Sequence, residues 1–252
     1  MSTLTLAAAQ LCCVAGDLEA NLQRHLQFME VAARHEVGFL LFPELSLTGY
    51  EPQWAHELAL TSESPVLAPL RRAAEQWRMT TVVGLPVRLP GNDEVLIGAL
   101  VLGAEGQVAL YTKQHLHPGE ERVFTPGQGG AQIRLNEQSI ALAVCADFAR
   151  PEHVEHAAAT GATLYAASAL ISENGYAHDS DLLQRYAREQ HLTVLMANHG
   201  GVSGGWACAG RSAIWAAGGA QVVAAPGPGD CLVLAQGAGR DWQGWVVLLQ
   251  GE

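Results

Sequence analysis

The sequence is short of charged residues, and of basic ones above all. Asp, Glu, Lys and Arg make up 15% of the 252 residues, and 14 basic residues face 25 acidic ones, giving a formal net charge of −11. The basic residues are scattered, with Arg71-Arg72 as their longest run. Nucleic-acid binding needs clustered Lys and Arg, so the composition argues against that class of partner. Sparse charge beside 49% hydrophobic residues favours a surface buried between subunits, and we predict a homodimer or higher homo-oligomer.

Long apolar runs, a signal-peptide pattern and paired cysteines are also lacking. No stretch approaches the roughly 18 apolar residues of a membrane span, and Met1-Ser-Thr-Leu-Thr-Leu6 has no basic region or cleavage pattern. The five cysteines, at positions 12, 13, 145, 208 and 231, have neither metal-pair nor disulfide-framework spacing. These features predict a cytoplasmic protein with free thiols and no membrane association. Since no linker, low-complexity block or repeat divides the chain, residues 1–252 are expected to form a single domain.

Helical and strand patterns alternate in the first part of the chain, and hairpins dominate the last part. Helices are predicted from just after Gly16-Asp17 to about Arg34, over residues 65–77, over a segment that begins at residue 151, and over residues 179–190. Strands are predicted over residues 4–12, 37–42, 80–85, 95–102, 107–112, 131–135, 140–144, 163–168, 193–198, 212–215, 221–225, 231–235 and 245–249. This order indicates an α/β protein with a mixed sheet. The strands outnumber what one open sheet usually holds, so two sheets are expected.

Cys145 ends an apolar run, Ile140-Ala-Leu-Ala-Val-Cys-Ala-Asp147, where a buried strand would leave the core. The alternative is a buried structural cysteine, the common fate of a free thiol. Asp147 is polar where a core strand would stay apolar, and a helix beginning at Pro151 would stabilise a thiolate through its N-terminus. These neighbours favour a nucleophile.

Two further strand ends carry opposite charges. Glu44 follows Phe39-Leu-Leu-Phe-Pro, and the apolar flanks Phe42, Leu45 and Leu47 predict a partly buried carboxylate with a raised pKa, suited to a general base. The alternative is a solvated loop residue. Lys113 follows Val108-Ala-Leu-Tyr-Thr and could stabilise an oxyanion, or could simply end an exposed hairpin. Glu, Lys and Cys in one pocket would suit attack on a carbonyl or nitrile carbon.

Together these segments resemble the nitrilase superfamily, the carbon–nitrogen hydrolases. Phe42-Pro-Glu-Leu-Ser-Leu-Thr-Gly-Tyr50 is similar to the family's Glu motif, Tyr111-Thr-Lys-Gln-His-Leu116 to its Lys motif, and Val144-Cys-Ala-Asp147 with Pro151-Glu152 to its Cys motif. The order and intervals agree as well. Supporting matches are Asp17 with Asn21, Ser168, Ala197-Asn198 and Gly210-Arg-Ser212. The resemblance covers nearly the whole chain.

The resemblance implies a four-layer α-β-β-α sandwich, commonly paired across subunits. It implies Cys145 as nucleophile, Glu44 as general base and Lys113 as stabiliser of the tetrahedral intermediate, with the Ala146 backbone N–H completing the oxyanion hole. The second glutamate of the family corresponds to Glu120, with Glu121 as the alternative. No cofactor is implied.

The chain departs from the family pattern near the mouth of the expected site. Ala146 replaces a common aromatic residue, and Ala149 replaces a common arginine, with Arg150 next. We expect the substrate to be bound by Tyr50, Ala149, Arg150, Ser168 and Asn198, although Arg150 fits a surface salt bridge equally well. The chain also lacks the long C-terminal extension of spiral-forming nitrilases, which favours an amidase.

The leading hypothesis is therefore a hydrolase that cleaves a small non-peptide amide through a cysteine thioester. A nitrilase, an N-carbamoyl hydrolase or a non-catalytic binding protein with the same fold are the alternatives. His115 and His117 with Glu120, or His153 with His156, could be drawn as metal ligands, but their spacing is not specific and no metal is predicted. Trp206, Trp215, Trp242 and Trp245 are expected in the core or in an interface.

Overall fold

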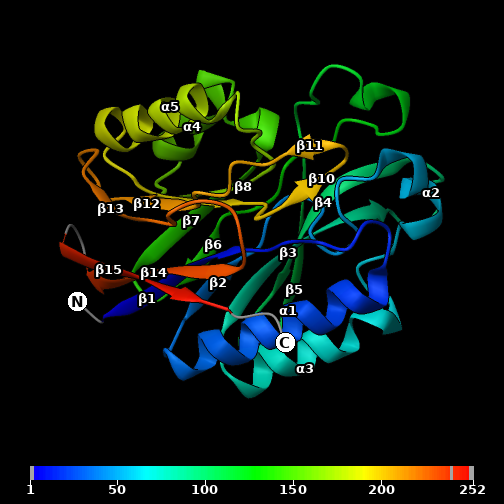
Figure 1. Cartoon of the computed structure of the whole chain (residues 1–252), viewed down its shortest axis with the longest axis horizontal. Coiled ribbons are helices and arrows are strands. Elements are labelled where there is room, and N and C mark those ends of the chain that lie inside the picture. The colour runs from blue at the N-terminus through cyan, green and yellow to red at the C-terminus, as the bar shows by residue number, and fades with distance from the viewer. Residues whose placement is uncertain (1–2, 239–240, 250–252) are drawn as a thin grey trace.

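Two β-sheets lie face to face, and helices cover the outer side of each (Figure 1). The structure is a computed structural model that describes residues 3–238 and 241–249. The seven-stranded sheet has the order β15-β14-β1-β2-β3-β4-β5, and the six-stranded sheet has the order β13-β12-β9-β8-β7-β6. The strands of the first sheet are β1 Leu4–Gln10, β2 Phe39–Leu41, β3 Thr80–Arg88, β4 Val95–Leu102, β5 Val108–Thr112, β14 Cys231–Ala238 and β15 Asp241–Leu248. Those of the second are β6 Ile133–Leu135, β7 Gln138–Val144, β8 Leu164–Ala169, β9 Thr193–Asn198, β12 Ala213–Trp215 and β13 Gln221–Ala224.

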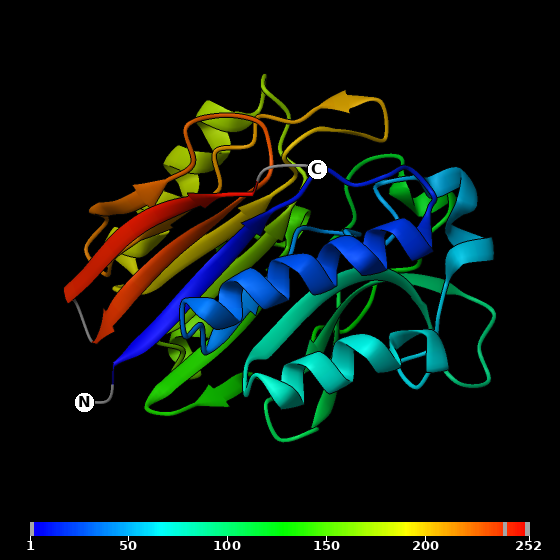
Figure 2. The same ribbon diagram turned by 60° about the horizontal axis from the view of Figure 1, so that its bottom comes forward.

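Two long helices pack on each outer face. Helices α1 (Leu18–Arg34) and α3 (Ala68–Gln76) lie side by side on the seven-stranded sheet, as Figure 2 shows. Helices α4 (Pro151–Ala159) and α5 (Tyr176–Glu189) cover the six-stranded sheet. Asp17 caps α1, because its carboxylate accepts a hydrogen bond from the Ala20 N–H at 2.9 Å. The predicted four-layer α-β-β-α sandwich is confirmed.

The central strands, such as β1, β7, β8 and β9, are largely apolar because both of their faces are covered. In β7, Ile140 and Leu142 point into the core between the sheets, whereas Ala141 and Ala143 pack under α4 and α5. Alternation along β1 divides its residues in the same way between the inter-sheet core and the helices α1 and α3. Strands β1, β2 and β3 are parallel neighbours, as are β7, β8 and β9. Each parallel set therefore gathers its carboxyl ends at one edge of its sheet.

The predicted strands and long helices are all present, with altered ends. Strand β1 stops at Gln10 instead of reaching Cys12, α5 begins three residues earlier than expected, and β15 begins four residues earlier. The sequence did not predict α2 (Ala55–Leu58), the hairpin of β10 (Val202–Ser203) and β11 (Trp206–Ala207), or four short 3-10 turns. Those turns are η1 Pro52–Trp54, η2 Pro65–Leu67, η3 Glu120–Arg122 and η4 Cys145–Asp147. Within residues 3–238 and 241–249, no helix combines the length and apolar character that a membrane crossing requires.

Candidate active site

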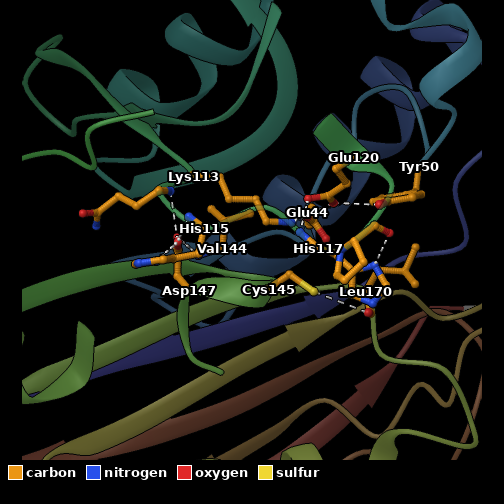
Figure 3. A network of polar contacts seen from close by, with 12 residues as sticks. Glu44, Tyr50, Lys113, His115, His117, Glu120, Val144, Cys145, Asp147 and Leu170 are labelled. Atoms are coloured by element: carbon orange, nitrogen blue, oxygen red, sulfur yellow. Dashed lines mark hydrogen bonds and ion pairs between the residues drawn. The ribbon is translucent and has the colours of Figure 1, made fainter. Parts of the chain in front are cut away.

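Three strand ends bring Glu44, Lys113 and Cys145 together, as the sequence suggested. Glu44 follows β2, Lys113 directly follows β5, and Cys145 directly follows β7. Glu44 and Lys113 thus come from the seven-stranded sheet and Cys145 from the six-stranded sheet, so the site lies where the two sheets meet (Figure 3).

Glu44 is a buried carboxylate with one free oxygen. Its residue is 1% exposed, and Oε1 lies 2.7 Å from Lys113 Nζ. Oε2 has no hydrogen-bond partner among the described residues. Burial raises the pKa of Glu44 to about 7, with Glu120 adding to the shift, while Lys113 and Cys145 oppose it. The raised pKa expected from the apolar flanks is confirmed, and the alternative of a solvated loop residue is wrong.

Lys113 is enclosed by carboxylates. Its side chain is fully buried, and Nζ lies 2.7 Å from Glu44 Oε1 and 2.8 Å from Glu120 Oε1. Burial alone would lower the pKa of Lys113, but Glu44, Cys145 and Glu120 raise it above its ordinary value. The ammonium is therefore charged at neutral pH, and the alternative of an exposed hairpin end is wrong.

Glu120, not Glu121, is the carboxylate beside the lysine. Glu120 is buried; its Oε1 accepts hydrogen bonds from Lys113 and from the Tyr50 hydroxyl, at 2.8 and 2.6 Å. Its Oε2 accepts a hydrogen bond from the His117 backbone N–H at 2.7 Å. Glu121 is exposed and accepts a hydrogen bond from the Gly119 N–H at the start of the same turn. Glu120 thus fixes the position of the ammonium.

Cys145 has a strained backbone and a protonated thiol. Its φ of +44° lies in the left-handed region, which is costly for a side chain other than glycine and recurs at functional sites. The thiol donates a weak hydrogen bond to the Leu170 carbonyl, with Sγ and O 3.7 Å apart. Burial raises the pKa of Cys145 well above its ordinary value, and the Glu44 charge raises it further. Stabilisation of a thiolate by the helix at Pro151 stays a prediction, because burial and the Glu44 charge act on the thiol in the opposite direction.

A cavity of about 200 Å³ opens beside these groups. Its lining includes Glu44, Tyr50, His117, Glu120 and Cys145. The other lining residues are Leu170, Ile171, Ser172, Gly175, Asp179 and Trp206, and the Leu170 carbonyl lies 3.7 Å from Cys145 Sγ. A cavity this small fits a small molecule.

Of the five residues predicted to bind substrate, Tyr50 alone is among the described residues that line the cavity. Ala149 and Arg150 are exposed at the start of α4, away from this lining. Ser168 is buried and donates a hydrogen bond to the Phe42 carbonyl at 2.9 Å. Asn198 is buried and bonds to both the N–H and the carbonyl of Ile171, at 2.8 and 3.0 Å. Ser168 and Asn198 therefore hold the backbone of Phe42 and Ile171 in place, and their bonded polar atoms do not line the cavity.

Asp147 connects the lysine loop to the cysteine turn, a role the sequence did not reveal. Its Oδ1 accepts hydrogen bonds from the backbone N–H groups of Gln114 and His115, at 3.0 and 2.8 Å. Its Oδ2 accepts hydrogen bonds from the Val144 N–H and the Tyr111 hydroxyl, at 3.0 and 2.8 Å. The polar residue that appeared out of place in the strand therefore holds the Lys113 and Cys145 segments at a fixed separation.

The Glu44 turn is held from behind by groups that sequence patterns did not mark. A Cβ at Gly84 would lie 2.4 Å from both the Leu45 nitrogen and the Pro43 carbonyl oxygen, so only glycine lets the turn pack against β3. The buried His199 bonds through Nε2 to the Glu44 carbonyl at 2.7 Å. Burial lowers the pKa of His199 to about 4, so its imidazole is neutral.

The histidines considered as metal ligands have other contacts. His153 lies between the Tyr111 and Tyr165 hydroxyls, each 2.8 Å away, and His115 Nδ1 is 3.2 Å from Asp147 Oδ1. His117 is exposed at the cavity rim. Among the described residues, no group of three or more His, Cys, Asp and Glu is arranged to hold a metal ion.

Comparisons with known proteins agree on one family. The carbon-nitrogen hydrolase family matches residues 5–236. An (R)-stereoselective amidase from Pseudomonas sp. is 28% identical over 215 residues, which cover 82% of this chain and 73% of the amidase. The glutamine-dependent NAD(+) synthetase of Aquifex aeolicus is 30% identical over 171 residues, 64% of this chain, and the match spans only 29% of the synthetase.

The fold matches that of a solved amidase from Nesterenkonia sp. AN1. Its Glu→Gln, Cys→Ala double mutant in complex with acrylamide superimposes with a TM-score of 0.85 at 26% identity, covering 94% of this chain and 91% of that one. In the Glu→Gln mutant of that amidase, the acetamide moiety of fluoroacetamide adds covalently to the active-site cysteine.

Proposed function

Since the chain belongs to the carbon–nitrogen hydrolase family, and is an amidase-like hydrolase of C–N bonds, we propose that it cleaves a small linear amide through a thioester on Cys145. One observation carries the proposal: Glu44 has a pKa of about 7, touches Lys113 at 2.7 Å and borders the cavity that Cys145 enters. A base that is half ionised at neutral pH matches a nucleophile that must first lose a proton.

Acylation begins with the protonated thiol. Glu44 accepts the Cys145 proton as Sγ attacks the amide carbon, and the carbonyl oxygen becomes an oxyanion. The Lys113 ammonium and the Ala146 backbone N–H stabilise that oxygen. Glu44 then returns the proton to the nitrogen, the C–N bond breaks, and ammonia or an amine leaves the Cys145 thioester.

Deacylation uses the same base. Glu44 takes a proton from water as the water oxygen attacks the thioester carbon, and a second oxyanion forms at the same position. The C–S bond breaks, the proton returns to Sγ, and the carboxylic acid is released. Glu120 keeps Lys113 in position in both steps, because it bonds to Nζ and is held by Tyr50 and the His117 N–H. No cofactor takes part in these steps.

Mass spectrometry of the intact protein tests the proposal. Wild type, Glu44→Gln and Cys145→Ser would be incubated with a panel of small amides, nitriles and carbamoyl compounds while ammonia release is followed. We expect turnover by wild type, a trapped acyl adduct on Cys145 in Glu44→Gln, and almost no turnover by Cys145→Ser. Comparable turnover by Cys145→Ser would refute the thioester route, and a nitrile-derived adduct alone would favour a nitrilase.

A further inference from the structure

Besides Glu44, Glu120 and Cys145, the cavity has a wall formed by the β8–α5 loop, the first turn of α5 and Trp206 of β11. Leu170, Ile171, Ser172 and Gly175 come from the loop between β8 and α5, and Asp179 comes from the first turn of α5. This wall begins beside the nucleophile, since the Leu170 carbonyl is 3.7 Å from Cys145 Sγ, and a cavity of about 200 Å³ leaves room only for a short substrate. Lining residues that take no part in the reaction are available to contact the rest of that substrate.

Asp179 brings to this wall a carboxylate that has no hydrogen-bond or salt-bridge partner among the described residues. It is half-buried and lines the cavity. Burial raises the pKa of Asp179, and the imidazoles of His178 and His117 oppose the shift. A carboxylate that is partly removed from water without a partner favours a ligand that supplies a cation.

Two cations, Lys113 beside Glu44 and Arg211 beside the β8–α5 loop, are already engaged. Lys113 is bonded to both Glu44 and Glu120. Arg211 pairs with Glu173 at 2.9 Å and lies over the Tyr176 ring, 5.1 Å from its centroid. Neither Lys nor Arg is among the described residues that line the cavity. Three carboxylates, those of Glu44, Glu120 and Asp179, line the cavity, and the Lys113 ammonium is the one buried cation beside them in the described structure. A negatively charged substrate would therefore be repelled.

Trp206 adds an aromatic surface to the same cavity. It is 51% exposed and lines the cavity from β11. Its hairpin is fixed on one side by a hydrogen bond from the Tyr50 N–H to Ser203 Oγ at 2.8 Å, and on the other by the Glu173 N–H to the Ala207 carbonyl at 3.0 Å. Because both anchors belong to cavity loops, the indole is held at the mouth, where an aromatic face attracts cations.

We propose that Asp179 and Trp206 form a subsite for a cationic group, so that the substrate is a short amide carrying an ammonium or guanidinium group at its far end. The inference rests on the proposed amidase function and narrows its substrate class. It also argues against carbamoyl amino acids and other carboxylate-bearing substrates. Glu44 lines the same cavity, and its free Oε2 is then available for the reacting amide.

Three amides of equal chain length test the charge preference. They are 4-aminobutanamide, which is cationic, pentanamide, which is neutral, and succinamate, which is anionic. For wild type we expect kcat/KM for 4-aminobutanamide to exceed that for pentanamide about tenfold, and succinamate to be the poorest of the three. Equal or better hydrolysis of pentanamide or succinamate would overturn the inference while leaving the amidase function intact. If none of the three releases ammonia or acylates Cys145, the amidase function fails, and the inference fails with it.

Two variants test the residues, each with a matched control. Asp179→Asn should reduce the ratio of the two kcat/KM values, cationic over neutral, by about tenfold, whereas Asp181→Asn, an exposed position on the same helix, should keep the wild-type ratio. Trp206→Leu should reduce the ratio about threefold, and Val202→Ala in the same hairpin should not. If Asp179→Asn fails to fold, Trp206→Leu still tests the subsite. A ratio that survives in folded Asp179→Asn, or in Trp206→Leu, would overturn the subsite.

Discussion

At the scale of single residues, the pKa of Glu44 is the result of opposing effects from burial and from its charged neighbours. Burial and Glu120 raise its pKa, while Lys113 lowers it, and the outcome is about 7. A carboxylate left in water would be fully ionised at neutral pH and a weak base. One buried without Lys113 would stay protonated and could not accept a proton. The two effects together give Glu44 the pKa that the proposed general base needs near neutral pH.

This balance predicts the acid limb of the pH–rate profile. Glu44 must be ionised to take the thiol proton, so kcat/KM should fall as the pH drops through about 7, by about tenfold per unit below that midpoint. Glu120→Gln removes the negative charge that raises the pKa of Glu44. The pKa of Glu44 should therefore fall, and the midpoint of the acid limb of kcat/KM should move to lower pH. The measurement is kcat/KM for an amide from pH 5 to 9.

Glu121→Gln is the matched control for that experiment. Glu121 is exposed and adjacent to Glu120 in sequence, but it does not touch Lys113 in the described structure. Its substitution should leave the midpoint where it is in wild type. A midpoint that moves equally in both variants would show that Glu120 does not act through its proximity to Glu44.

Single residues were predictable from sequence only where their local flanks carried the signal. The apolar neighbours of Glu44 indicated burial, and three strand ends with Glu, Lys and Cys indicated one site. The burial of Lys113 depends on Glu44 and Glu120, which are distant in sequence, and so it could not be read locally. The same holds for Asp179: nothing in its own helix distinguishes it from Asp181 until the hairpin at Trp206 folds over the cavity.

At the scale of elements, the site depends on the distance between the lysine loop and the cysteine turn. These segments follow β5 and β7, which belong to different sheets, so no sheet hydrogen bond fixes their separation. Asp147 supplies that connection through three hydrogen bonds, from the Gln114 and His115 N–H groups and the Tyr111 hydroxyl, and a fourth from the Val144 N–H holds the carboxylate within its own turn. A buried carboxylate with these partners has a structural role in addition to any effect on catalysis.

Asp147→Asn should disrupt this connection while preserving the size of the side chain. An amide nitrogen would replace one accepting oxygen, so donors on that side would be buried without an acceptor. We expect the free energy of unfolding to fall by about 2–4 kcal/mol. We also expect kcat/KM to fall by about 10²-fold, because Lys113 and Cys145 are no longer held in register. Urea unfolding and amide hydrolysis measure the two effects.

Asp93→Asn offers a control for Asp147→Asn, since Asp93 is exposed in the turn before β4. This substitution should change the free energy of unfolding by no more than about 0.5 kcal/mol. Wild-type stability in Asp147→Asn would mean that the backbone holds the two segments without the carboxylate.

Elements with a regular apolar period were predicted well, and irregular ones were not. The apolar residues of α1 recur at helical spacing, and the buried strands are apolar at consecutive positions. Each pattern indicates burial directly, because a helix covers one stripe of side chains and a strand covered on both sides covers all of them. The β10–β11 hairpin has two-residue strands with exposed Val202 and Trp206. Its position is fixed by bonds to Tyr50 and Glu173, which are far away in sequence, so the local pattern gave no sign of it.

At the scale of the whole molecule, charge and cavity point in the same direction. The net charge is −11, and the described cavity lining contains carboxylates without Lys or Arg. A field of this sign raises the local concentration of cations and repels anions at low salt. The global composition and the proposed subsite therefore favour the same class of substrate. The homodimer or higher homo-oligomer inferred from sparse charge stays a prediction.

The whole molecule is held together by the apolar layer between the two sheets, and this layer also joins Glu44 and Lys113 to Cys145. Leu195 of β9 is fully buried in it. Leu195→Ala should lower the free energy of unfolding by about 2–5 kcal/mol, because methyl groups are lost and the sheets cannot collapse fully onto the cavity. Urea titration monitored by tryptophan fluorescence measures the midpoint and slope.

Leu248→Ala supplies the comparison that isolates the inter-sheet layer. Leu248 lies at the end of β15 and is 67% exposed, so its substitution should cost no more than about 0.5 kcal/mol. An equal loss in both variants would mean that stability does not depend on the inter-sheet contact. If the two sheets unfold as one unit, Leu195→Ala should lower the urea midpoint without changing the slope of the free energy against urea, and Leu248→Ala should change neither. The active site, which takes residues from both, would then be lost in that same transition.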